Sequence, residues 1–396
     1  MKILVLNSGS SSIKFKFFDD NIVKASGLVE KIGENNSKVI LKDILKDKKF
    51  ERDLAIKDHE EGIKIVNELF KQSGILKDLS ELDGCGHRIV HGGRNLNKHC
   101  LVNEYVLKEI DRVSVFAPLH NQAHLSGIKT MLKSAPNVKN ATIFDTAFHQ
   151  SMPDYAYMYA LPYELYENFN IRKYGFHGTS HSYVSSRASI LLNKDKSELN
   201  AISAHLGNGS SVCAIENGKS IDTSMGFTPL EGLIMGTRCG DLDPAILPFV
   251  AKFKNLSIDQ IDTLMNKNSG MYGICGFNDF RDIEEEIKKG NDKARLALDM
   301  FCYRLVKYIG AYFAILPRTD AIIFTGGIGE NDSLVRQKVC EKLAHFGLDL
   351  DLNLNKDNSK PERIISKEGS RVKIFIIPTD EELEIARITK ELISQN

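Results

Sequence analysis

Three glycine-rich segments have the composition of phosphate-binding loops. They span residues 7–12, 207–211 and 325–331, and each follows a run of apolar residues. Phosphate oxygens need many N–H and O–H donors, and glycine lets the backbone approach them closely. Lys14, just beyond the first segment, adds a positive charge. Each segment alone also fits an ordinary turn, but the three together predict a nucleotide-phosphate site.

Two arginines and two histidines have the chemistry to hold small anions. Arg88 and Arg238 each lie among glycines, and His177 has glycines close by on both sides. A guanidinium grips a carboxylate or a phosphate through two parallel hydrogen bonds. An imidazole such as that of His177 or His120 can donate to charge that develops on a phosphoryl group. Taken singly, these residues also fit surface ion pairs or a polar core.

Two acidic residues stand where a metal ion could be bound. Asp145 ends the apolar run 143–144, and Glu381 stands at the start of a predicted helix. Mg²⁺ in nucleotide enzymes takes one or two carboxylates together with water and phosphate oxygens. An acidic residue at a helix start is also favoured by the helix dipole, so Glu381 fits both interpretations.

Composition narrows the class of protein. The formal net charge is zero over 396 residues, which argues against a nucleic-acid-binding protein. The longest apolar stretches fall well short of the roughly 20 residues of a membrane span, and the N-terminus lacks the apolar core of a signal peptide. Seven scattered cysteines without a C-x-x-C pair argue against disulfides and structural zinc. We therefore expect a cytoplasmic protein without a membrane partner.

The elements that must position these residues alternate between strands and helices. Apolar runs flank the first two glycine-rich segments, which predicts two hairpins about half a chain apart. Helices are expected over 57–71, 293–316 and 381–393, and buried strands over 321–324 and 372–377. The class is therefore α/β, and the repeated hairpin suggests two related halves around one cleft.

The motifs taken together resemble those of the acetokinase family. Residues 4–14 closely resemble the N-terminal signature of acetate kinases, and residues 205–211 resemble their second phosphate loop. The segments 87–93, 145–149, 176–181, 236–240, 279–282, 326–331 and 379–382 resemble the rest of the active-site set. The motifs run in the family's order from residue 4 to residue 382, so the resemblance covers nearly the whole chain.

The resemblance implies a role for each candidate residue. The catalytic residues would be Asp145, His177, Arg238 and Arg88. The metal ligands would be Asn7 and Glu381. The substrate-binding residues would be Arg88, Val90, Leu119, His120, Phe176 and Pro229. The ATP-binding residues would be Ser10, Ser12, Lys14, His205, Leu206, Gly207, Asn208, Gly209, Asp279, Phe280, Arg281, Gly326, Gly327, Ile328, Gly329, Glu330 and Asn331.

The resemblance also implies the architecture and the reaction. The fold would be a duplicated actin-like ATPase fold of the ribonuclease H-like type, with two domains around a nucleotide cleft. One domain would span residues 1–149 plus 383–396 and the other residues 150–382. The protein would work as a homodimer that transfers the γ-phosphoryl group of ATP to acetate by direct in-line attack, with Mg²⁺, or Mn²⁺ in its place.

Two alternatives to an acetate kinase stay open at this point. Propionate and butyrate kinases of the same family share the motifs, and Val90 would crowd the extra methylene of propionate, a difference worth about 10- to 200-fold. From another class, an actin-like ATP-dependent binding module would share the fold. One departure is visible, because Asp380 stands where the family pattern has asparagine.

Overall fold

The computed structural model describes residues 1–395, apart from the side chains of Pro118 and Leu119. The chain divides into two compact units. Unit 1 comprises residues 1–147 together with the C-terminal segment from Asp380, and unit 2 comprises Phe148–Thr379. These limits fall close to the expected domain boundaries at residues 149 and 382, and the domain assignment itself stays a prediction.

The sheet of unit 1 has the strand order β5-β4-β3-β2-β1-β6-β8-β7. Its strands are β1 (Lys2–Ser8), β2 (Ser12–Asp19), β3 (Ile22–Glu30), β4 (Ser37–Asp43), β5 (Lys48–Leu54), β6 (Gly84–Ile89), β7 (Cys100–Leu101) and β8 (Lys139–Phe144). The helices of this unit are α1 (His59–Ser73), α2 (Glu104–Arg112), α3 (Pro118–Ser134) and α15 (Glu381–Ser394). Strands β1, β6 and β8 are parallel, so their carboxyl ends lie at one edge of the sheet.

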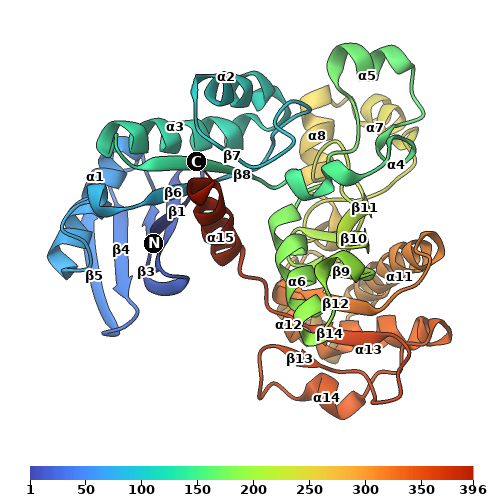
Figure 1. Cartoon of the computed structure of the whole chain (residues 1–396). Coiled ribbons are helices and arrows are strands. Elements are labelled where there is room, and N and C mark those ends of the chain that lie inside the picture. Colours follow the sequence, from blue (N-terminus) through green and yellow to red (C-terminus); the bar gives the residue numbers. More distant parts are fainter. Residues whose placement is uncertain (396) are drawn as a thin grey trace. The chain divides into compact units, whose positions relative to one another are not determined.

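Strand β1 shows why this sheet is covered on both faces. Leu4 and Leu6 belong to the core that β2 and α1 share, whereas Ile3 and Val5 belong to the core that α15 completes. Successive side chains of a strand point to opposite faces, so a continuous apolar run such as 3–6 requires a layer on each side. The C-terminal helix α15 supplies the second layer and packs against β1, β6 and β8 (Figure 1).

The sheet of unit 2 has the strand order β11-β10-β9-β12-β14-β13. Its strands are β9 (Ala201–Leu206), β10 (Ser210–Glu216), β11 (Lys219–Thr223), β12 (Ala321–Thr325), β13 (Arg363–Ile364) and β14 (Lys373–Ile376). The helices are α4 (Asp154–Tyr157), α5 (Tyr163–Phe169), α6 (Gly178–Leu191), α7 (Ile246–Lys254), α8 (Ile258–Lys267), α9 (Gly270–Cys275), α10 (Phe280–Lys288), α11 (Asp292–Ile315), α12 (Gly326–Asn331), α13 (Ser333–Lys342) and α14 (Leu352–Lys356).

This second sheet is also buried on both faces. Ile202 and Ala204 of β9 pack into the core formed with α10, α11 and α13, whereas Ala201 belongs to the core shared with Val184 and Ala188 of α6. The long helix α11 begins after Asn291, whose side chain accepts hydrogen bonds from the backbone N–H groups of residues 293 and 294.

The two sheets share one topology. In unit 1 an antiparallel hairpin, β1–β2, is followed on the other side of β1 by the parallel strands β6 and β8. In unit 2 the hairpin β9–β10 is followed in the same way by the parallel strands β12 and β14. The predicted pair of related α/β halves is therefore confirmed, and both glycine-rich hairpins form where the sequence predicted them.

One sequence expectation, for residues 326–331, differs from the structure. Residues 326–331, interpreted as a glycine-rich loop, form the short helix α12, because Gly326 with a φ of 77° lets the chain turn directly from β12 into a helix. The seven cysteines are all free thiols. Within residues 1–395, no helix is long and apolar enough to cross a membrane.

Candidate active site

Arg88, Asp145 and Glu381 form a charged cluster in unit 1. Arg88 lies in β6, Asp145 follows the neighbouring parallel strand β8, and Glu381 is the first residue of α15. The Arg88 guanidinium donates from Nε to Oδ1 of Asp145 over 3.1 Å and from Nη2 to Oδ2 over 2.7 Å. Its Nε also lies 3.8 Å from Oε2 of Glu381. One guanidinium thus holds two carboxylates at the carboxyl edge of the sheet.

Burial and ion pairing together shift the pKa values of Arg88 and Glu381. Asp145 is only 2% exposed, whereas Arg88 and Glu381 keep about a fifth of their side-chain surface exposed, at 23% and 21%. The Asp145 carboxylate raises the pKa of Arg88 above its usual range, so the guanidinium stays charged. Burial raises the pKa of Glu381, which the positive charge of Arg88 opposes. Glu381 is therefore a carboxylate that would gain from an additional cation.

The first predicted phosphate loop is the turn between β1 and β2. The Gly9 N–H donates to the Ser12 carbonyl over 2.7 Å, and His59 Nε2 donates to the Gly9 carbonyl over 2.8 Å. Ser10 is exposed at the turn and Ser12 opens β2. Asn7 and Lys14 are cross-strand partners, so both lie on the same face of the hairpin.

Lys16 is a charged residue of this hairpin that lies outside the sequence motifs. It lies two residues after Lys14 on β2, and its Nζ contacts Oδ1 of Asp380 over 3.3 Å and Oε2 of Glu382 over 3.2 Å. The period of two along a strand, which places Lys14 and Lys16 on one face, is the sequence signal that could have indicated it. Lys16 thereby pairs with the acidic residue that departs from the family pattern.

The remaining unit 1 candidates lie at the end of β6 and the start of α3. Val90 follows β6 and is half-buried, and His120 is exposed in the first turn of α3. Asn121 of α3 connects the two segments, because its side chain accepts a hydrogen bond from the His91 N–H and donates one to the His91 carbonyl. The side chain of Leu119, another predicted substrate contact, lies outside the described residues.

His177 lies at a strained backbone position in unit 2. Its φ of 56° is in the left-handed region, directly before α6. Its Nδ1 is 2.9 Å from the Ser211 hydroxyl, and its ring stacks on that of His205 at a centroid distance of 4.2 Å. A non-glycine residue in this region costs free energy, and such strain is concentrated at functional sites. The predicted transition-state histidine is thus held by β9 and β10.

Arg238 and His177 both lie beside Gly209. An added Cβ on Gly209 would be 3.3 Å from Arg238 Nη1 and 3.6 Å from His177 Nε2. Arg238 donates to the Pro229 carbonyl over 3.1 Å, and within the described part of the chain it forms no ion pair with a carboxylate. Burial lowers the pKa of Arg238 somewhat from its very high ordinary value. A half-buried cation without a carboxylate is well suited to bind an anion.

The glycine-rich segment before Gly209 is fixed to the Arg238 segment. The Gly236 N–H donates to the Asn208 carbonyl over 3.0 Å, and a Cβ on Gly236 would lie 1.8 Å from Asn208 Oδ1. Only glycine leaves room for this contact. The residues interpreted from sequence as a phosphate loop and as an anion-binding arginine are therefore parts of one local structure.

Next to this structure, unit 2 contains a pocket of about 660 Å³. It is lined by Gly207, Asn208, Asn278, Asp279, Phe280, Arg281, Glu284, Gly327, Ile328, Asn331 and Asp332. A volume of this size is typical of nucleotide and cofactor sites. Residues from three separate sequence motifs thus meet around one cavity, as the predicted nucleotide site requires.

Some predicted ATP contacts do not line this pocket, and some lining residues were not predicted. Leu206 is fully buried in the core, and Glu330 Oε1 accepts from the Gly326 N–H over 2.9 Å. Asn278, Glu284 and Asp332 also line the pocket, but they were not predicted because each lies just outside the bounds of a motif. Proximity to a motif in sequence is the signal that could have found them.

Two sheets of one topology, with a pocket at the glycine-rich ends of the strands, define a protein with the actin-like ATPase fold. Residues 2–387 match the acetokinase family. The chain belongs to that family. It is 77% identical over 396 residues to an acetate kinase of Campylobacter jejuni subsp. doylei, with all of both chains covered.

Solved structures of this family are also similar. An acetate kinase of Porphyromonas gingivalis has a TM-score of 0.95 and 41% identity, with 99% of each chain covered. A propionate kinase of Francisella tularensis has a TM-score of 0.91 and 41% identity, again with 99% of each chain covered. The fold is therefore common to relatives that are named for different acids.

Proposed function

We propose that this protein reversibly transfers the γ-phosphoryl group of ATP to acetate, which gives acetyl phosphate and ADP. One observation carries the proposal beyond family membership. The pocket that would hold the nucleotide is lined by Gly207 and Asn208, and the next residue, Gly209, adjoins Arg238 and His177. A nucleotide in the pocket would extend its terminal phosphate along this glycine segment toward the two donors.

In unit 2, Arg238 and His177 would stabilise the transferring group. Phosphoryl transfer passes through a loose transition state whose charge is spread over the equatorial oxygens. A guanidinium without a carboxylate partner and an imidazole N–H are donors of the kind that such charge requires. His205, Asp279 and Arg281, together with α12, would hold the rest of the nucleotide.

In unit 1, Glu381 and Asn7 would hold Mg²⁺, and Asp145 would be the central carboxylate beside it. The donors fit the ion, since carboxylate and amide oxygens suit Mg²⁺. Partial burial raises the pKa of Glu381, so a nearby cation would stabilise its ionised form. Among the described residues, no group of three acidic, histidine or cysteine side chains could form a metal site by itself. Held by Glu381 and Asn7, the ion would neutralise charge on the nucleotide's phosphates.

The acid would be bound by Arg88, with Val90, Leu119, His120, Phe176 and Pro229 as further contacts. A carboxylate with a pKa well below 7 is already a nucleophile at neutral pH, so no general base is required. Positioning and charge stabilisation then suffice for in-line attack. Transfer from ATP with a chirally labelled γ-phosphate tests this, because net inversion supports direct transfer and retention would indicate a phosphoenzyme.

A hydroxamate assay with acetate, ATP and Mg²⁺ tests the function itself. Acyl hydroxamate should form with Mg²⁺, and with Mn²⁺ in its place, and should disappear when EDTA removes the metal. ATP hydrolysis without acyl phosphate would instead favour an actin-like binding module.

A panel of acetate, propionate and butyrate tests which acid is preferred, and we expect acetate to have the highest kcat/KM. We further propose that the protein is a homodimer, which a sedimentation measurement can test. We also propose a cytoplasmic location, which cell fractionation can test.

A further inference from the structure

A chain of buried hydrogen bonds lies behind the ring of His177. Ser211 Oγ is 2.9 Å from His177 Nδ1 and 2.8 Å from His181 Nε2. His181 Nδ1 is in turn 2.6 Å from Ser203 Oγ. Ser203, His181 and Ser211 are completely buried, so water does not compete for these bonds. Each donor in the chain must therefore face an acceptor.

The number of protons allows two arrangements of the donors and acceptors in this hydrogen-bond chain. Burial lowers the pKa of His181 well below its ordinary value, so at neutral pH its ring carries one N–H. Ser211 has one hydroxyl proton between two ring nitrogens, so it donates to one of them and accepts from the other. The direction in which Ser211 donates is thus linked to the tautomer of His177.

In the first arrangement, His181 Nε2–H donates to Ser211 and Ser211 donates to His177 Nδ1. A neutral His177 then carries its proton on Nε2. In the second arrangement, Ser211 donates to His181 and His177 Nδ1–H donates to Ser211. A neutral His177 would then have an unprotonated Nε2, whereas an imidazolium would still carry a proton on Nε2. Both arrangements satisfy Ser211 and the two nitrogens of His181, which accepts from Ser203 at Nδ1 in the first and donates to Ser203 from Nδ1 in the second.

An anion next to Nε2 selects between these arrangements. Nε2 is the nitrogen of His177 that lies beside Gly209 and the Arg238 guanidinium. A phosphoryl oxygen bound there requires a donor, which excludes the bare Nε2 of the second neutral arrangement. We propose that Ser211 and His181 are positioning residues, which keep a proton on His177 Nε2 facing the transferring phosphoryl group. This inference rests on the proposed kinase function.

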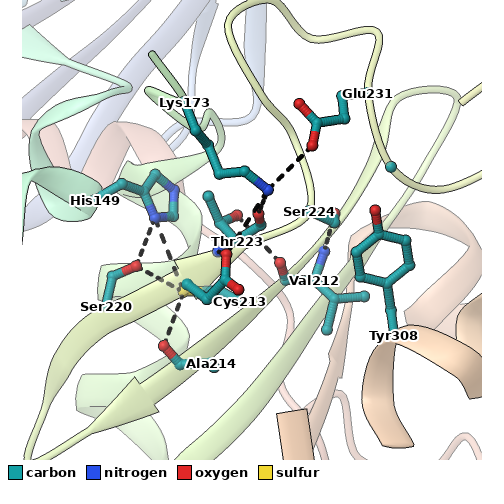
Figure 2. Close-up of polar contacts among 12 residues, drawn as sticks. His149, Lys173, Val212, Cys213, Ala214, Ser220, Thr223, Ser224, Glu231 and Tyr308 are labelled. Carbon is teal, nitrogen blue, oxygen red and sulfur yellow. Dashed lines mark hydrogen bonds and ion pairs between the residues drawn. The ribbon is translucent and has the colours of Figure 1, made fainter. Parts of the chain in front are cut away.

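A second buried serine–histidine pair holds the backbone of the same loop. His149 Nε2 donates to the Phe176 carbonyl over 2.9 Å, so its Nδ1 is the acceptor of the Ser220 hydroxyl at 2.8 Å. Figure 2 shows this pair, with Cys213 in contact with Ser220 at 3.2 Å. Ser220 is as buried as Ser211, but its hydrogen bond ends on His149 and not on His177. It is therefore a matched control.

The test compares Ser211→Ala with Ser220→Ala in the full-length protein. For S211A we expect kcat to fall about 10- to 100-fold, with the KM for ATP changed by less than about threefold, because only transition-state hydrogen bonding is impaired. S220A should lose a similar amount of thermal stability and keep kcat within about threefold. Equal losses of kcat in both variants would overturn the proposal.

A double-variant cycle with His177→Ala gives a readout that a purely structural role would not give. If Ser211 acts through His177, S211A should lower kcat in the wild-type background but leave the residual activity of H177A unchanged. An additional loss in the H177A background would contradict the proposal. Failure of the function itself looks different, because the wild-type protein would then form no acyl hydroxamate.

A measurement on the wild-type protein covers the case in which the variants do not fold. With ¹⁵N-labelled histidine and a non-hydrolysable ATP analogue with Mg²⁺, the His177 resonances should show a protonated Nε2. A neutral His177 protonated on Nδ1 in this complex would overturn the inference.

Discussion

Arg88 and Asp145 are joined by two parallel hydrogen bonds between neighbouring parallel strands, and the carboxylate is almost completely buried. Such a bidentate pair fixes both side chains in one geometry. It also makes each partner depend on the other, because removing one leaves a buried charge without compensation. This dependence underlies the first prediction.

Asp145→Asn should impair both stability and activity. The variant keeps the shape of the side chain but removes the charge that Arg88 pairs with, which should lower the free energy of unfolding by about 3 kcal/mol. We expect kcat to fall by more than about 100-fold, because the central carboxylate is lost. Chemical denaturation and the hydroxamate assay measure the two effects. The exposed pair Glu60–Lys133 provides a control, since Glu60→Gln should change neither.

Glu381→Gln should change how stability depends on pH. Burial raises the pKa of Glu381, so the folded state binds this proton more tightly than the unfolded state. The contribution of Glu381 to stability therefore falls as pH rises from the ordinary glutamate pKa through the raised one. The glutamine variant lacks this loss, so its Tm relative to wild type should increase between acidic and neutral pH. Parallel Tm curves for the two proteins would contradict the assignment.

Gly209→Ala should slow the reaction while the protein stays folded. The added Cβ would lie 3.3 Å from Arg238 Nη1, so this guanidinium must move by a few tenths of an ångström, and 3.6 Å from His177 Nε2, which is an ordinary contact. Small displacements of this kind reduce transfer rates, and we expect kcat to fall about tenfold. Gly310→Ala is the control, since an added Cβ in α11 meets no atom within 4 Å. Equal kcat in both variants would show that the space beside Gly209 is not used.

Asp380→Asn should have little effect on metal dependence. Asp380 Oδ1 accepts from the Leu383 N–H at the start of α15, and Lys16 lies 3.3 Å away and compensates the charge. Asparagine keeps the helix cap and loses a partly exposed ion pair, which should cost less than about 1 kcal/mol. The concentration of Mg²⁺ for half-maximal activity should change less than about threefold.

Comparing Asp380→Ala with Asp380→Asn separates the contribution of the helix cap to stability from that of the charge. The alanine variant removes the cap as well, so its free energy of unfolding should be about 1 kcal/mol lower than that of D380N. Equal stability of the two variants would show that the cap contributes nothing.

Local patterns predicted the elements of this fold well. Two β-rich runs, 3–6 and 13–18, with glycine and serine between them, predicted the β1–β2 hairpin, and the same pattern predicted β9–β10. Residues 326–331 were the exception, because three glycines in six residues indicate a loop unless packing stabilises a helix. Strand Ala321–Thr325 and helix Ser333–Lys342 are packed in the same core on either side, which favours the short helix α12 between them.

The residue types at the site and the family could both be recognised from the order of the motifs along the chain. Arg88, His177 and Arg238 could be chosen as candidates because they stand among glycines, and Asp145 because it ends an apolar run. Their individual roles stay predictions. The partners of these side chains became visible in the folded protein alone. The pairing of Lys16 with Asp380 joins residues 364 positions apart, and the chain from His177 through Ser211 to His181 joins α6 to β10. Local periodicity carries no information about such contacts, because they depend on how separate elements pack around a common core.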